Sequence, residues 1–226
     1  MKNNDITLTN NISYLELNEN INLLHNKNNN LRKNALSQLL FNNGINFITD
    51  SKKYNLENEI VSPLDLSELL FYVDKDIEKF VFITCIIAES YHYICNCFNA
   101  LHIRKPIITY ARFSKNDYGI FMQNIEPAIM FINLEKLITE EQEDITYKEQ
   151  AELTIYHELC HAIQNAFGFS SSIIENVNSH SSERLDLMEQ QAEDFAYDAI
   201  WYQANNLNPI GLIQRYIRDL HKIDTW

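Results

Sequence analysis

The stretch "YHELCHAIQNAFG", residues 156–168, places two histidines four positions apart, with a glutamate directly after the first. On an α-helix, His157 and His161 lie one turn apart on the same face, so both imidazoles can reach one metal ion. Glu158 lies about 100° around the helix axis from His157 and about 60° from His161, close enough to reach a water molecule beside that ion. This is the HExxH geometry, in which two neutral imidazoles are ligands and the carboxylate is a general base.

The residues on both sides of the motif predict the helix that this geometry requires. Thr146 and Glu149 form a Thr-x-x-Glu capping box, which starts a helix, and Gly168 ends it after Phe167. In a chain with seven histidines and 31 acidic residues, an accidental HExxH match has a probability of roughly one or two per cent. A coincidental motif is therefore the alternative against which the rest of the chain is weighed.

A second helix is predicted over residues 181–206, and it supplies a third ligand. Its apolar side is formed by Leu185, Met188, Ala192, Phe195, Ala196 and Ala199. Glu189 falls among these residues, and a carboxylate in an apolar stripe is costly unless it is paired or coordinated, so Glu189 is the candidate ligand. Glu193, one turn further on, is the candidate acceptor for the second ring nitrogen of a ligand histidine. Two imidazoles and one carboxylate with an open fourth position predict one zinc ion per chain.

"HELCH" followed, 28 positions after His161, by "EQQAEDFA" resembles the HExxH…E-x-x-A-[D/N/E]-x-F-A pattern of compact gluzincin metallopeptidases, in particular the ImmA/IrrE-like zinc metallopeptidase family. The resemblance covers about residues 105–205. It implies a zincin-like (minigluzincin) core with a small antiparallel sheet before the active-site helix. It also implies zinc held by His157, His161 and Glu189, with Glu158 as the general base. The chain departs from the pattern at Glu193, where Asp or Asn is more usual, and its first hundred residues show no helix-turn-helix.

The fold class predicted from the whole chain is α+β, with a helical N-terminal portion and a small sheet. Three segments rich in β-branched and aromatic residues, at 107–113, 118–124 and 128–134, are expected to form an antiparallel meander. We divide the chain into an asparagine-rich arm (1–30), a helical N-terminal portion (31–105) and the metallopeptidase core (106–226).

Three helices are predicted in the N-terminal portion. The first covers residues 31–41 and ends before Gly44; the face toward the core is formed by Leu31, Ala35, Leu39 and Leu40. The second starts at Ser62 and Pro63, because proline suits the first helical position. The third runs from Asp74 until Pro106 ends it, and it is apolar nearly all round in its middle, which predicts a buried central helix.

The charge and the hydropathy exclude some partners. With 18 basic and 31 acidic side chains the net charge is −13, and such a surface repels nucleic-acid backbones. The apolar run at 80–88 ends at Glu89, short of the ~20 residues of a membrane span, so we expect no span. The N-terminus shows no secretory signal, which favours a cytoplasmic location.

Other reactive side chains are expected to play smaller parts. Cys85, Cys95, Cys97 and Cys160 are predicted to be free thiols, and a soft-metal site at Cys95 and Cys97 is the less favoured alternative. His92 and His102 are expected in the long apolar helix as core or interface residues. Candidate donors to a transition-state oxyanion, chosen by their proximity in sequence, are His180, Arg184, Tyr197 and Tyr202. For each of these four, a plain surface role is the competing interpretation.

The leading hypothesis is a zinc metallopeptidase that hydrolyses a peptide bond of a protein or peptide substrate; the resemblance suggests a regulatory protein. A secreted or injected effector protease acting on a host protein is a second reading. A catalytically inactive zincin-fold binding protein is the third, and the presence of all three ligands together with Glu158 argues against it.

Overall fold

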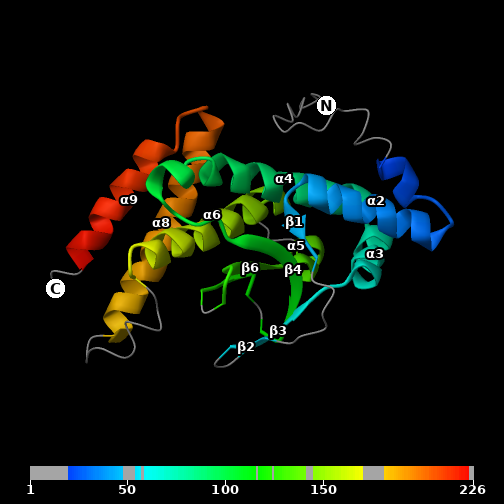
Figure 1. Ribbon diagram of the computed structural model, residues 1–226, viewed down its shortest axis with the longest axis horizontal. Helices are drawn as coiled ribbons and strands as arrows, with labels where there is room; N and C mark the ends of the chain where they lie inside the picture. Colours follow the sequence, from blue (N-terminus) through cyan, green and yellow to red (C-terminus); the bar gives the residue numbers. More distant parts are fainter. Residues whose placement is uncertain are drawn as a thin grey trace.

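The computed structural model describes residues 20–47, 54–56, 59–115, 117–123, 125–140, 145–169 and 181–223. It confirms the α+β class (Figure 1). Of the predicted N-terminal arm, residues 1–19 lie outside the described part, whereas residues 20–24 are helical. The elements that follow are α2 (Asn29–Asn42), β1 (Ile45–Asn46), β2 (Tyr54–Leu56), β3 (Glu59–Pro63), α3 (Leu66–Lys75), α4 (Ile77–Cys95), η1 (Asn99–Leu101), β4 (Ile107–Phe113), β5 (Gly119–Met122), β6 (Ile129–Asn133), α5 (Leu134–Thr139), α6 (Tyr147–Ala166), α8 (Ser181–Ala204) and α9 (Ile210–Ile223).

The sheet is mixed, so the predicted antiparallel meander is wrong. Its strand order is β2-β3-β4-β6-β5, with β1 also paired to β4. Strand β6 runs parallel to β4 and antiparallel to β5. All five residues of β6 are buried, whereas β5 is mostly half-buried. The more apolar strand therefore takes the covered central position, as strands buried on both faces do, and β5 becomes the sheet edge.

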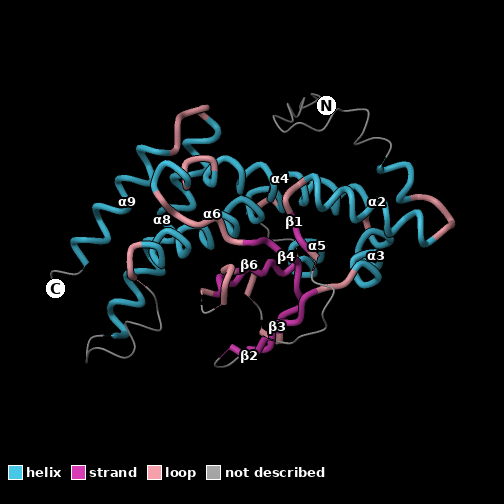
Figure 2. The backbone as a smooth tube through the Cα atoms, viewed as in Figure 1, coloured by secondary structure: helices cyan, strands magenta, loops and turns pink. Residues whose placement is uncertain are grey.

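Helices cover one face of this sheet (Figure 2), and α6 packs between β5 on one side and α4 and α8 on others. One hydrophobic cluster joins Leu36 of α2, Phe80 of α4, Ile132 of β6, Leu159 of α6 and Phe195 of α8. The core thus runs without interruption across the predicted boundary at residues 105 and 106. The helix that carries the HExxH motif lies at its centre.

The N-terminal helices differ from the sequence predictions at their ends. Helix α2 matches the predicted helix at 31–41, but Leu31 is 43% exposed and is not part of the core. The helix start predicted at Ser62 and Pro63 is wrong, because these residues end β3. Helix α3 begins after Asp65, which forms a reciprocal capping box with Glu68 and so satisfies the first backbone N–H groups.

Helix α4 ends at Cys95, earlier than the predicted end at Pro106. The chain then turns through η1, and His102 adopts a left-handed conformation with φ of 57°, so this histidine lies outside the helix. The segment Ile77–Leu101 is the one stretch in the described ranges that is long and apolar enough to cross a membrane. Of its most apolar window, 67% is buried inside the protein, as in the core helix of a folded domain.

Candidate metal centre

The helix predicted for the HExxH motif is confirmed as α6. The Thr146 hydroxyl accepts a hydrogen bond from the Glu149 N–H at 3.2 Å at its start, and Gly168 lies just beyond its end with φ of +85°. Ile155, which precedes His157, and Leu159, which lies between the two histidines, are fully buried. Because both ends are capped and its apolar residues are packed, α6 is a rigid support for the site.

The second predicted helix is confirmed as α8, and its small residues let it pack closely on α6. Ala192 and Ala199 of α8 are fully buried, and α8 packs against α6. Glu189, however, does not lie inside the apolar stripe as predicted, since 59% of its side chain is exposed. It lies at the edge of the stripe, and its carboxylate opens onto a cleft.

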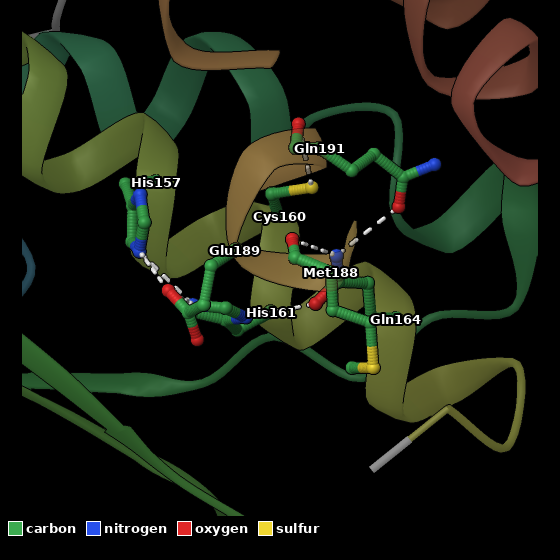
Figure 3. A network of polar contacts seen from close by, with 7 residues as sticks. All are labelled: His157, Cys160, His161, Gln164, Met188, Glu189 and Gln191. Carbon is green, nitrogen blue, oxygen red and sulfur yellow. Dashed lines mark hydrogen bonds and ion pairs between the residues drawn. The ribbon is translucent and has the colours of Figure 1, made fainter. Parts of the chain in front are cut away.

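Three donor atoms from α6 and α8 converge on one point (Figure 3). The Nε2 atoms of His157 and His161 are 3.0 Å apart, and Oε2 of Glu189 lies 3.2 Å from the first and 3.5 Å from the second. Two ligands of a tetrahedral zinc ion, each bonded at 2.0–2.1 Å, are separated by about 3.3 Å. The observed spacing fits one ion with an open fourth position. No other such group of histidine, cysteine or acidic residues occurs among the residues that the structure describes.

The charges at the triad favour a cation. Hydrogen bonds from His157 and His161 hold the pKa of Glu189 well below its usual range. Burial lowers the pKa of His161, but the hydrogen bond to Glu189 and the charges of Glu158 and Glu189 outweigh that effect and raise the pKa to about 9. A metal ion at this point therefore replaces a proton on His161, and its binding releases protons.

The Glu158 carboxylate is hydrogen-bonded to strand β5 and is not one of the three converging groups. It is 5% exposed, and burial raises its pKa, although His157 and His161 partly offset this effect. Its carboxylate accepts a hydrogen bond from the backbone N–H of Phe121 in β5. A carboxylate whose pKa is raised and whose position is fixed beside a cation site is suited to accept and return a proton.

Strand β5 forms one wall of the cleft with its free edge. The backbone N–H of Asn133 donates to the Tyr118 carbonyl at 2.8 Å, so these two residues form a hydrogen-bonded pair between β6 and β5. Hydrogen-bonded pairs alternate with non-hydrogen-bonded pairs along an antiparallel ladder, so the backbone groups of Gly119 and Phe121 face away from β6. The cleft has a volume of about 770 Å³ and is lined by residues of β5, α6 and α8. Gly119 lies against Glu158, and a Cβ atom there would be only 2.8 Å from the Glu158 side chain.

Gln164 is a site residue that the sequence analysis missed. Its Oε1 lies 2.8 Å from Nδ1 of His161, in the place that Glu193 was predicted to fill. Glu193 is exposed and lines the cleft, and within the described part of the chain it makes no hydrogen bond or ion pair with either histidine. The sequence spacing could have identified Gln164, because it lies three residues after His161 and therefore on the same helix face.

The predicted oxyanion donors are not brought together. His180 lies outside the described residues. Tyr197 is 58% exposed and lines the cleft, whereas Tyr202 packs against the core beside Trp201, and Arg184 does not line the cleft. Of the four, Tyr197 alone reaches the cleft in the described structure.

The cysteines are free thiols, as predicted. Cys160, which flanks the histidines, is 1% exposed, and burial raises the pKa of its thiol, so it is an inert core residue. Burial also raises the pKa values of Cys95 and Cys97, which opposes the thiolate form that a metal needs.

Comparisons of the chain with protein-family models, with curated proteins and with solved structures found no match. The assignment of this centre therefore rests on its own geometry: two imidazoles and a carboxylate close enough to bind one metal ion, with a buried glutamate beside them.

Proposed function

We propose that the protein is a zinc-dependent metallopeptidase with a zincin-like core that hydrolyses peptide bonds of a protein or peptide substrate. The observation that carries the proposal is the convergence of His157, His161 and Glu189 at 3.0–3.5 Å while Glu158 is held apart by Phe121. A purely structural zinc site is closed by four protein ligands, whereas three ligands with an open position are typical of catalytic zinc.

The ligands to zinc would be His157, His161 and Glu189. When bound, zinc would polarise a carbonyl group and make water more acidic. Glu158 then accepts the proton of the attacking water and returns it to the leaving amine. Its burial and its hydrogen bond from Phe121 support this role, because they fix the carboxylate beside the proposed metal position.

The free edge of β5 supports a polypeptide substrate. Gly119 and Phe121 line the cleft next to the triad, and an extended peptide can pair with the outward N–H and C=O groups of Gly119 and with the C=O of Phe121. Since Phe121 also donates to Glu158, a peptide bound along β5 lies beside the general base.

Hydrolysis by matched proteins tests the proposal. Zinc-loaded wild type and Glu158→Gln are incubated with a pool of unstructured peptides, and new amino termini are identified by mass spectrometry. Glu158→Gln keeps all three ligands, so it should bind zinc and lose at least about 100-fold in rate, the scale of general-base catalysis. The proposal is wrong if zinc-loaded wild type cuts no peptide, or if the variant cuts as fast as wild type.

A further inference from the structure

Gln164 carries a polar amide into the core of the protein, where it is fully buried. Burial of an amide is unfavourable unless its atoms form hydrogen bonds. Its Nε2 donates to the Met188 carbonyl at 2.9 Å and to Oε1 of Gln191 at 3.1 Å, and its Oε1 faces Nδ1 of His161 at 2.8 Å (Figure 3). The amide thus joins α6 to α8 directly behind the metal triad.

These contacts fix the orientation of the amide and the protonation of the imidazole. A backbone carbonyl only accepts hydrogen bonds, so the atom that faces Met188 must be the amide nitrogen. The amide oxygen therefore faces His161, and because that oxygen also only accepts, the proton of a neutral His161 must lie on Nδ1. The lone pair of Nε2 is then free to point at the metal position.

We propose that Gln164 is a positioning residue for the metal centre, which holds His161 as the Nδ1–H tautomer and fixes α8 beside the third ligand. Met188 directly precedes Glu189, so one side chain sets the ring of one ligand and the backbone next to another. The inference rests on the metal site and not on peptide hydrolysis.

A neutral amide suits this position better than a carboxylate. Glu158 and Glu189 already place two carboxylates near His161, and a third carboxylate, fully buried at position 164, would carry a cost of desolvation. Hydrogen-bond partners of ligand histidines typically change metal affinity by 10–100-fold when they are removed.

Zinc affinity, measured by competition with a chromophoric chelator, tests the inference on the full chain. Gln164→Leu should bind zinc 10–100-fold more weakly than wild type. The matched control is Gln191→Leu, which removes a second buried amide of the same network but leaves the Gln164 bonds to His161 and Met188 in place. It should keep zinc affinity within about threefold, since it touches no ligand. The inference is overturned if Gln164→Leu stays within threefold of wild type or if both variants lose affinity equally.

A conservative variant separates positioning from packing. Gln164→Glu keeps an acceptor for the Nδ1–H group but loses the donor to Met188, so its zinc affinity should fall between those of wild type and Gln164→Leu. Equal loss in the Glu and Leu variants would contradict the tautomer role.

A spectroscopic measurement on the wild type needs no variant at all. In zinc-loaded, ¹⁵N-histidine-labelled protein, the His161 Nδ1 proton should be visible and exchange slowly with solvent. A His161 that lacks a proton on Nδ1 overturns the inference. Failure of the wild type to bind zinc would remove the metal site itself, whereas normal zinc binding with no peptide hydrolysis would remove the peptidase and leave the role of Gln164 standing.

Discussion

Gly119 is the point where the edge strand β5 touches the proposed general base, and Gly119→Ala tests that contact. A Cβ atom at this position would lie 2.8 Å from Cγ and Oε1 of Glu158 and 2.9 Å from Cγ2 of Thr154. Ordinary contacts between such atoms begin at about 3.5 Å, so the two elements must separate by at least about 0.7 Å. Helix α6 is packed on several sides, whereas β5 is paired on one side only, so we expect β5 to move.

The displacement weakens the hydrogen bond from Phe121 to Glu158 and shifts the cleft wall. A misplacement of about 1 Å at a reacting group can cost ~10²-fold in rate, so peptide hydrolysis should fall by about 10- to 100-fold. Overpacking should also lower the free energy of unfolding by about 1–3 kcal/mol. Zinc affinity should stay within about threefold of wild type, because the three ligands come from α6 and α8.

The control is Gly211→Ala in α9, where an added Cβ meets nothing within 4 Å. Alanine is favoured over glycine in a helix, so this variant should keep its rate and gain up to about 1 kcal/mol in stability. The assay compares initial rates on one cleaved peptide, zinc content and thermal unfolding for the three proteins. If Gly119→Ala keeps its rate within threefold, or loses zinc in proportion to rate, the contact does not act through Glu158.

Three further outcomes are expected. Burial raises the pKa of Glu152, and Lys148 offsets part of the rise, so this carboxyl destabilises the fold as pH rises from its unfolded pKa of about 4.3 through its higher folded pKa. Glu152→Gln should therefore raise the melting temperature at pH 7 by about 2–4 °C for each kcal/mol of destabilisation that it removes. A melting temperature below that of wild type would contradict this prediction. The described cleft lining includes Asp117, Glu189 and Glu193 but no lysine or arginine, so peptides with basic side chains near the cleaved bond should be preferred; Glu193→Lys should reduce that preference by about three- to tenfold, measured with paired Lys and Glu peptides. Removal of zinc with a chelator should lower the stability of wild type by about 2.7 kcal/mol relative to zinc at 100 times its Kd, and should leave Glu189→Ala unchanged; equal shifts would place the metal elsewhere.

The parts of the site that sequence could predict are those set by local signals. The cap at Thr146, the helix period and Gly168 agree on one helix, so His157 and His161 had to share a face. Glu189 was predicted as the third candidate ligand because it fell among the apolar residues of one helix side, although its side chain proved to be exposed at the edge of that stripe.

The parts that sequence could not predict depend on contacts between distant segments. Whether β6 pairs with β4 in parallel is decided by which strand is covered on both faces, and that depends on how the helices pack. Strands β1 and β2, with two and three residues, are too short to show an alternating pattern, and β3 ends at Ser62 and Pro63, where the sequence predicts a helix start. The roles of Gln164 and Gly119 likewise follow from α8 and β5 lying against α6, which no spacing within one segment reveals.

X-ray absorption at the zinc edge of protein loaded with one equivalent of zinc tests the central claim most directly, because it reports the elements bonded to the ion. We expect about one zinc per chain, bonded to nitrogen and oxygen at 2.0–2.1 Å with no sulfur ligand, and loss of this signal in Glu189→Ala. Zinc that is bonded to sulfur at about 2.3 Å, or a wild-type protein that takes up no zinc, would contradict the assignment of His157, His161 and Glu189 as its ligands.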